Sequence, residues 1–412
     1  MTSGTFTIRC ARIFDGENIL DDGRTNIVVS EGRVVDLCPP DRAPGEVIDR
    51  SRQFGLPGLI DAHFHAYSPS LKIAEIDVLP RTLLSQYGRA ALEGALSRGF
   101  TTVRDAGGAD EGLWTAQARG LFRGSRLYYA GKALAPTGGH GDFRGQFSGC
   151  ACGCSYSGAI SRVVDGEDEV RRAVRDELRA GAHHIKLFLS GGLLSGGQRV
   201  ETQQFSDREV LAAIQEAQGR GAYVLAHCHT TGSVERAARL GVRSVEHGSR
   251  ISQSVATQIA EAGAFVVPTL VAFHVIREHG RDRGLPAAII DGADELLEAS
   301  KASIRQCRSA GVKVGLGTDI FDATLHPMQL MELSLRSEVD EPLDVLRSAT
   351  SVNADLTDTH GGIGRLRVGD RADVVCVAEA AIDNRKRRLD FAGNLSLVML
   401  EGAVVPSSRA GA

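Results

Sequence analysis

The sequence predicts an α/β protein: a parallel (β/α)8 barrel of the TIM type, together with a small β-sandwich formed by both chain termini. Between residues 58 and 320, short apolar runs alternate with helical patterns, which is the signature of βαβ units. We count eight such runs. Eight strand–helix units close a barrel without an edge, whereas five or six would favour an open doubly wound sheet. The two ends of the chain carry shorter alternating runs separated by turn residues.

Each of the eight runs is expected to form one barrel strand. They are Gly58 to His65, Thr101 to Gly107, Leu127 to Leu134, His184 to Ser190, Tyr223 to His229, Arg243 to His247, Phe265 to Leu270 and Lys313 to Asp319. The helical stretches between them include Leu79 to Arg98, Glu167 to Ala180, Asp207 to Arg220, Ser252 to Ala262 and Ala287 to Ala310. In such barrels the carboxyl ends of all strands meet at one mouth, and that mouth is where a site is expected.

The two ends of the chain are expected to form one domain together. Neither Thr5 to Asp49 nor Gly361 to Pro406 could bury both faces of its strands alone, so we predict that they pair. Residues 1–57 and 361–412 would then form the sandwich, with the barrel of residues 58–360 inserted between them. The longest connection runs from Pro136 to Asp165, and long loops in compact barrels are commonly functional or disordered.

Composition argues against several classes of partner. The chain has 412 residues, of which 42% are hydrophobic and 24% charged, with a net charge of -4. A strong basic field for nucleic acid or for an anionic membrane is therefore absent, which favours a small-molecule substrate. No secretory signal is visible, and the apolar stretch from Phe265 to Phe273 is too short to span a bilayer. We expect a cytoplasmic protein with reduced cysteines, and a homo-oligomer because barrels of this type often associate.

Histidines recur at the carboxyl ends of the predicted strands. His63 and His65 lie two residues apart on the first strand, so alternation directs both into the barrel. His227 and His229 repeat this spacing on the fifth strand. The sixth and eighth strands end in His247 and Asp319. Any one of these side chains could have a purely structural role, but nitrogen and oxygen ligands from four strands together predict a site for zinc or a neighbouring metal.

Lys186 is predicted to point into the same lumen. Alternation sends Lys186 and Phe188 to one side of the fourth strand, and Ile185 and Leu187 to the other. A buried, unpaired ammonium is costly. A buried lysine can instead lose its proton and react with carbon dioxide, which gives a carbamate that bridges two cations. An ordinary ion pair is the alternative.

These segments together resemble the amidohydrolase superfamily. The resemblance rests on Gly58 to His65, on Ile185 to Leu187, on His227, on Val245 to Gly248 and on Gly317 to Asp319. It implies two divalent metal ions, with zinc as the favoured metal. His63, His65, N-carboxylated Lys186 and Asp319 would surround one metal, and His227, His247 and the second oxygen of the carbamate would hold the other. Asp319 would act as general base and then acid for a metal-bridging hydroxide.

A narrower resemblance concerns the substrate. The segment from Pro136 to Phe143 is similar to the branch of prolidase-like and carboxypeptidase-like Xaa dipeptidases. It implies that His140 grips a carboxylate or carbonyl group of the substrate and that Arg144 assists by charge. His140 could also simply make a turn. Where that branch commonly has tyrosine, this chain has His229, a departure that weighs against a preference for dipeptides. His229 is expected to face the pocket, where it either contacts substrate or is an ordinary histidine of the lumen.

The sequence thus predicts a binuclear metal-dependent hydrolase of an amide or peptide bond, in a dipeptide or an N-acyl amino acid. Aryl amides, carbamates, ureas or lactams are alternative substrates for the same metal centre. A non-catalytic metal-binding barrel is the alternative outside enzymes. Cys150, Cys152 and Cys154 lie too close together for a usual structural zinc site, so we predict a loop with reduced thiols.

Overall fold

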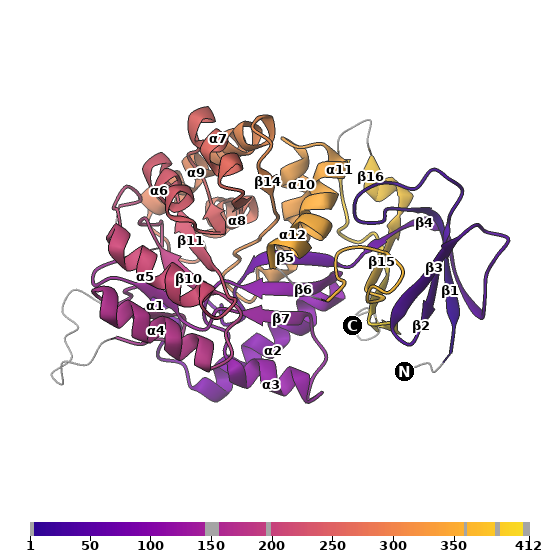
Figure 1. Cartoon of the computed structure of the whole chain (residues 1–412), viewed down its shortest axis with the longest axis horizontal. Coiled ribbons are helices and arrows are strands. Elements are labelled where there is room, and N and C mark those ends of the chain that lie inside the picture. The colour runs from indigo at the N-terminus through magenta and orange to yellow at the C-terminus, as the bar shows by residue number, and fades with distance from the viewer. Residues whose placement is uncertain (1–3, 145–155, 195–198, 358–360, 384–387, 407–412) are drawn as a thin grey trace.

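The computed structural model describes residues 4–144, 156–194, 199–357, 361–383 and 388–406. A barrel wrapped by helices occupies one side of the molecule, and a sheet shared by both ends of the chain lies beside it (Figure 1). The α/β class, the barrel and the contribution of both termini to one sheet are as predicted. The three cysteines at positions 150, 152 and 154 lie outside the described residues.

Parallel strands form the barrel wall. In chain order they are β5 (Leu59–Phe64), β6 (Phe100–Asp105), β7 (Arg126–Tyr129), β8 (Ala133–Ala135), β9 (Ser161–Val163), β10 (Ile185–Phe188), β11 (Val224–Cys228), β12 (Ser244–His247), β13 (Phe265–Val267) and β14 (Lys313–Val314). β5 to β7 pair in chain order, and β10 to β14 do the same. β8 pairs with β10 on one side and with β9 on the other.

Two hydrogen bonds outside the strands close the ring. The Ala62 amide donates to the Leu316 carbonyl at 2.9 Å, which joins β5 to the segment after β14. The His183 amide donates to the Tyr129 carbonyl at 2.9 Å, which joins β7 to the segment before β10. The barrel therefore has no open edge between its first and last strands.

The regular strands are shorter than predicted, and the third, seventh and eighth differ most. The seventh ends at Val267, and Leu270, its predicted last residue, begins the helix Leu270–His279. The third is divided into β7 and β8 around Gly131, whose φ of +71° is available to glycine but not to most residues. The eighth keeps only β14 as regular strand. The remainder of the predicted eighth strand, up to Asp319, still runs beside β5, because the Asp319 amide donates to the His63 carbonyl at 2.8 Å.

Helices cover the outside of the barrel (Figure 1). They are α1 (Ile73–Ile76), α2 (Arg81–Ser97), α3 (Glu111–Ala118), α4 (Glu167–Arg179), α5 (Asp207–Gln218), α6 (Thr231–Leu240), α7 (Gln253–Glu261), α8 (Leu270–His279), α9 (Ala287–Ser309), α10 (Met331–Ser337), α11 (Pro342–Arg347) and α12 (Asn353–Thr357). In α4 the buried residues are Val170, Ala173 and Val174, at the i, i+3, i+4 spacing of an amphipathic helix. α5 begins with a capping box in which Ser206 and Glu209 bond each other's backbone amides. In the described part of the chain, no helix has the length and apolar character needed to cross a bilayer.

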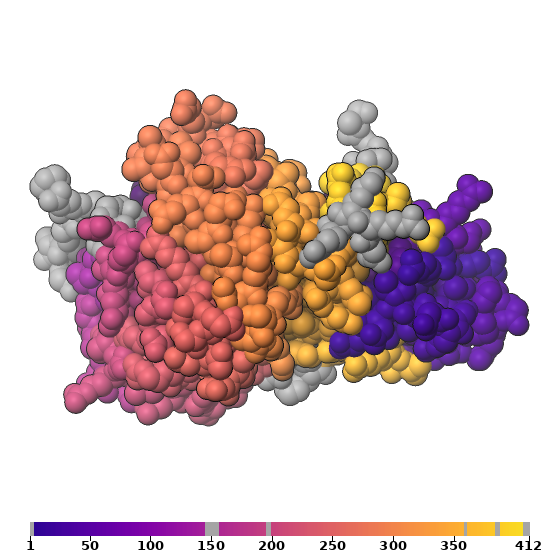
Figure 2. Space-filling view, turned by 90° about the horizontal axis from the view of Figure 1, so that it is seen from above, coloured from indigo at the N-terminus to yellow at the C-terminus, as the bar shows by residue number. Residues whose placement is uncertain are grey.

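The two ends of the chain share one seven-stranded mixed sheet. Its strands are β1 (Phe6–Ile13), β2 (Asn26–Ser30), β3 (Arg33–Cys38), β4 (Glu46–Pro57), β15 (Val374–Ala378), β18 (Leu395–Leu400) and β19 (Ala403–Val404). A separate small hairpin consists of β16 (Ile382–Asp383) and β17 (Arg388–Leu389). β15 pairs antiparallel with β4, so C-terminal strands extend the N-terminal half. From above, the N-terminal and C-terminal segments lie together at one end of the molecule (Figure 2).

This sheet leads directly into the barrel. β4 ends at Pro57 and β5 begins at Leu59, with only Gly58 between them. A Cβ atom on Gly58 would lie 2.1 Å from the Thr101 hydroxyl oxygen, so the chain passes too close to β6 for any larger residue. We propose that the boundary between the terminal domain, residues 1–57 and 361–412, and the barrel, residues 58–360, falls at this glycine.

Candidate metal centre

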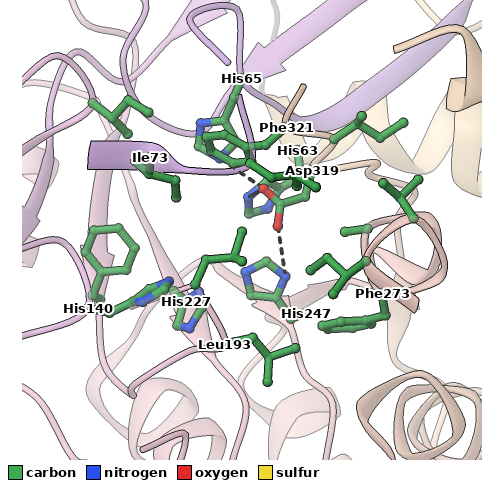
Figure 3. A pocket seen from close by; sticks show the side chains of 18 of the residues that line it. His63, His65, Ile73, His140, Leu193, His227, His247, Phe273, Asp319 and Phe321 are labelled. Carbon is green, nitrogen blue, oxygen red and sulfur yellow. Dashed lines mark ion pairs between the residues drawn. The ribbon is translucent and has the colours of Figure 1, made fainter. Parts of the chain in front are cut away.

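The cavity at the carboxyl ends of the barrel strands is lined by most of the residues singled out from the sequence (Figure 3). These are His63, His65, His140, Lys186, His227, His229, His247 and Asp319. Arg144 is not among the described lining residues; its guanidinium pairs with Asp142 at 2.6 Å. Side chains separated by more than 250 positions in sequence thus share one cavity.

Asp319 and two histidines form a first group of possible metal ligands. Asp319 Oδ1 lies 3.1 Å from His65 Nε2 and 3.4 Å from His63 Nε2. One donor atom from each of the three residues lies within 4.8 Å of the other two. Figure 3 shows the carboxylate between this histidine pair and His247, whose Nδ1 is 3.9 Å from Asp319 Oδ2.

A second group consists of three histidines, His227, His229 and His247. Each offers one ring nitrogen, and these nitrogens also lie within 4.8 Å of one another. The ring centroids of His227 and His247 are 4.6 Å apart. Imidazole nitrogens with a carboxylate oxygen nearby are the donor set that zinc and other first-row divalent metals prefer, so the residues present fit two such ions.

Every histidine of the two groups uses one ring nitrogen for a hydrogen bond to a supporting side chain or carbonyl group. The pairs are His63 Nδ1 with Glu246 at 2.7 Å, His65 Nδ1 with the Gly107 carbonyl at 2.8 Å, His227 Nε2 with the Gly191 carbonyl at 3.0 Å, His229 Nδ1 with Ser249 at 3.0 Å and His247 Nδ1 with Thr269 at 2.8 Å. Such bonds fix the orientation of an imidazole and leave the other nitrogen for a cation.

Two of the candidate ligands have an unusual backbone conformation. His247 has φ of +65° and Asp319 has φ of +52°, in the left-handed region that only a few per cent of non-glycine residues adopt, with aspartate and histidine among those that tolerate it best. Asp61 helps to hold the Asp319 segment, because its buried carboxylate accepts a hydrogen bond from the Thr318 amide at 3.1 Å and another from the Gln329 side chain at 2.8 Å. Backbone strain of this kind is typical of functional sites whose surroundings enforce it.

Burial keeps most of the histidines neutral. It lowers the pKa of His140 to about 4 and that of His229 to about 3, and it holds those of His227 and His247 well below the usual value. His65 differs: burial opposes its charged form, but the Asp319 carboxylate outweighs burial and raises the pKa. A neutral imidazole is the form that binds metals, so four of these rings are ready for that role or for hydrogen bonding to a substrate.

Lys186 points into the cavity as strand alternation predicts, together with Phe188. Its side chain is buried, and its Nζ lies 5.7 Å from the centre of the Phe188 ring. Burial lowers the pKa of Lys186 to about 8. Among the residues described, no hydrogen bond or salt bridge to its ammonium is present, although the Glu246 and Asp319 carboxylates are close enough to act on its charge.

The remaining lining residues are apolar. They are Leu71, Ile73, Phe143, Ile160, Phe188, Leu193, Leu194, Ala272, Phe273, Val275, Ile276, Ile320 and Phe321. His140 lies among them with its Nδ1 buried and without a hydrogen-bond partner. Its ring lies 4.5 Å from that of His227, centroid to centroid. An unpartnered imidazole nitrogen beside the candidate ligands is available to a bound molecule.

The residues that support these ligands do not stand out in the sequence. Glu246 and Arg104 are fully buried behind His63, and Ser249 and Thr269 hold two other rings. One feature of the sequence did point to Glu246. It immediately precedes His247 in a predicted buried strand, and a buried carboxylate needs a cation or a hydrogen-bond donor as its partner. Arg104 lies in β6, where no motif pointed to it.

A parallel barrel with histidines and an aspartate gathered at the carboxyl ends of its strands defines a class of metal-binding hydrolases. The sequence pattern of the amidohydrolase family matches residues 54–405, and the chain belongs to this family. It is therefore a hydrolase that acts on carbon–nitrogen bonds, as the sequence motifs predicted.

Characterised proteins and solved structures agree with this assignment. Ochratoxinase from Aspergillus niger is 30% identical over 354 residues, which cover 80% of this chain and 71% of the enzyme. The structure of a prolidase complexed with N-methylphosphonate-L-proline is 35% identical, with a TM-score of 0.90 and coverage of 98% of this chain and 99% of the other. A Xaa-Pro dipeptidase with bound methionine is 25% identical, with a TM-score of 0.83 and coverage of 98% and 100%.

Proposed function

We propose that this chain is a binuclear metal-dependent amidohydrolase that cleaves the amide bond of a dipeptide or an N-acyl amino acid. The observation that carries the proposal is the position of Asp319, whose carboxylate lies within 3.4 Å of His63 and His65 and 3.9 Å from His247. It therefore lies between the two groups of nitrogen donors. The prolidase and the Xaa-Pro dipeptidase, both of which superimpose on nearly the whole chain, support the substrate class.

In this proposal His63, His65 and Asp319 hold one divalent ion. Of the second group, His227 and His247 hold another ion, which leaves His229 for the substrate. Zinc is the metal we propose, because it prefers imidazole nitrogen and carboxylate oxygen in closely spaced sites. Two such ions would supply a water whose pKa is lowered toward neutrality and would polarise the scissile carbonyl group.

Lys186 is proposed to be N-carboxylated. Its buried Nζ has no partner among the described residues, and a cationic side chain beside two metal ions would be repelled. Carboxylation by carbon dioxide turns this amine into an anion with two oxygens. One oxygen could then serve each metal, which explains why a lysine rather than an arginine stands at this position.

Asp319 is the proposed proton carrier. Its carboxylate would accept the proton of the attacking water and then donate it to the nitrogen of the leaving group. The hydrogen bond from its own amide to the His63 carbonyl, at 2.8 Å, and the left-handed backbone hold the side chain at the centre of the cavity. General acid–base catalysis of this kind contributes about 10²- to 10⁴-fold to rate.

His140 and His229 are the proposed substrate contacts. Both side chains are buried and line the cavity, and His140 Nδ1 has no other partner. A neutral imidazole can donate to a carbonyl or carboxylate oxygen. Arg144 was expected to add charge, but its ion pair with Asp142 at 2.6 Å leaves it outside the described cavity wall, so we do not include it.

A second candidate is a hydrolase of aryl amides, carbamates or ureas that lack a carboxylate. The observation in its favour is that Lys186 is the one lysine or arginine among the described residues that line the cavity. A substrate carboxylate would therefore depend on neutral histidines or on the metals.

A hydrolysis screen of the zinc-loaded protein separates the two candidates. It would compare dipeptides and N-acyl amino acids carrying large apolar side chains with aryl carbamates and phenylureas of similar size. The proposal predicts turnover of the first group, lost when the metals are removed by a chelator and restored by zinc. Turnover of the aryl carbamates and phenylureas alone would contradict the proposal and support the second candidate.

A further inference from the structure

Behind the first group of ligands, a buried carboxylate contacts His63. Glu246 Oε2 lies 2.7 Å from His63 Nδ1, and both side chains are almost completely inaccessible to solvent. His63 Nε2 faces the other way, 3.4 Å from Asp319. The imidazole therefore lies between Glu246 below and the cavity above.

A buried arginine holds this carboxylate in turn. Arg104 Nη2 donates to Glu246 Oε1 at 2.8 Å, and Ser244 donates to the same oxygen. Arg104 Nε donates to the carbonyl of Ala62 at 2.6 Å, and Ala62 directly precedes His63 on β5. β6 thus provides an arginine that binds both the strand carrying His63 and the carboxylate on β12 that orients its ring.

This arrangement distinguishes His63 from the other candidate ligands. His65 and His227 bond to backbone carbonyls, and His229 and His247 bond to hydroxyl groups. Apart from contacts with Asp319 itself, His63 is the one ring of these five that has a carboxylate as its partner. A carboxylate partner fixes the tautomer of a metal-binding imidazole and makes its free nitrogen a stronger donor.

We propose that Glu246 and Arg104 are positioning residues for the metal held by His63, His65 and Asp319. Glu246 keeps the proton of His63 on Nδ1, so that Nε2 stays free and aimed at the cavity. Arg104 neutralises the buried carboxylate. Its hydrogen bonds to Glu246 and to the Ala62 carbonyl hold the carboxylate in a fixed position relative to β5. This inference rests on the proposed function, because it concerns the affinity of the first of the two proposed metals.

The pair must be replaced together, because removing one charge would leave the other buried without a partner and would destabilise the protein. Two double variants test the role of the carboxylate. Arg104→Met with Glu246→Gln keeps an acceptor for His63 Nδ1 but removes both charges. Arg104→Met with Glu246→Leu removes the acceptor as well. Glu332→Gln, which alters a fully buried acid on α10, is the matched control.

Zinc affinity is measured by chelator competition on metal-free protein, which resolves a stronger and a weaker binding step. The Leu variant should weaken one step by about 10- to 100-fold and leave the other within about threefold, with the Gln variant between it and wild type. The Glu332→Gln control should match wild type. Wild-type affinity at both steps in both double variants would overturn the inference while leaving the proposed function intact.

The tautomer of His63, that is, which of its two ring nitrogens carries the proton, gives a second readout that needs only the wild-type protein. In wild-type protein labelled with ¹⁵N-histidine, long-range ¹H–¹⁵N spectra should show the His63 proton on Nδ1 with or without zinc. A proton on Nε2 in either state would overturn the inference. Binding of fewer than two zinc ions by the wild-type protein would count against the proposed function, and the His63 tautomer would still decide the role of Glu246.

Discussion

Asp319 Oδ1 and His65 Nε2 lie 3.1 Å apart, although 254 positions separate the two residues in the chain. The contact forms because the segment after β14 returns alongside β5 and because Asp319 adopts a left-handed backbone there. It joins the last barrel segment to the first strand at the centre of the proposed catalytic site.

Replacing Asp319 with asparagine should abolish most turnover. The amide cannot take up and return a proton, so kcat should fall by about 10²- to 10⁴-fold, whereas two metals should still bind through the histidines and Lys186. Steady-state kinetics and metal analysis of the same preparation test this. Asp291→Asn, at an exposed position on α9, is the control. Unchanged kcat in Asp319→Asn would remove the residue from the mechanism.

Replacing Lys186 with methionine should lower the metal content. Methionine fills a similar volume but cannot form a carbamate. The variant would therefore lack the carbamate oxygens that are proposed to serve the two metals. Wild-type protein equilibrated with ¹³C-bicarbonate should give a carbamate carbon signal that Lys186→Met lacks and that Lys313→Met, at an exposed position on β14, retains. Two tightly bound metals in Lys186→Met would show that the lysine is dispensable for the metal centre.

Gly192 is expected to determine the position of His140. A Cβ atom on Gly192 would lie 2.6 Å from His140 Cε1, a distance that forces the ring to move. Gly192→Ala should therefore lower kcat/KM by about tenfold, mainly through KM, because a displaced imidazole would lose its contact with the substrate and about 1.4 kcal/mol of binding free energy corresponds to tenfold. Gly232→Ala on α6, where a Cβ would meet nothing within 4 Å, should leave the kinetics unchanged. An unaffected Gly192→Ala enzyme would argue against substrate contact by His140.

Strand alternation was sufficient to predict which side chains face the barrel interior. His63, His65, Lys186 and His227 line the cavity as their parity requires. His247 and Asp319 also line it, but with positive φ values that a pattern of apolar and polar residues does not encode. The sequence predicted which residues lie at the carboxyl end of the barrel, not how the backbone turns there.

Two features depend on tertiary contacts and could not be read from local patterns. The role of Arg104 arises from a cross-barrel ion pair with Glu246, which only the closed ring brings together. Arg144 lies close in sequence to His140, but its ion pair with Asp142 directs it elsewhere. The division of the third strand follows from Gly131, whose backbone conformation interrupts an otherwise continuous apolar run.

Glu332 should make the protein less stable as pH rises. Burial raises the pKa of this carboxyl to about 8, although its Oε2 accepts a hydrogen bond from the Val271 amide at 2.7 Å. The folded protein therefore holds a proton that the unfolded chain releases above about pH 4.5. Its contribution to stability is complete below that pH and is lost as pH rises toward about 8.

Glu332→Gln removes this titration, so the variant should be more stable than wild type at pH 8 by at least about 1 kcal/mol, with a smaller gain at pH 5. Urea unfolding at both pH values, with the metal state held constant, measures the difference. A gain that does not change with pH, or a loss at pH 8, would contradict the assigned protonation.

The most direct test of the metal centre is a crystal structure of the zinc-loaded protein with anomalous diffraction measured at the zinc edge. We predict two anomalous peaks about 3.5–4 Å apart. One peak should lie among His63, His65 and Asp319, and the other beside His227 and His247, with density for a carboxylate extending from Lys186 Nζ between them. A single peak, or two peaks with an unmodified Lys186 turned away from both, would contradict this prediction.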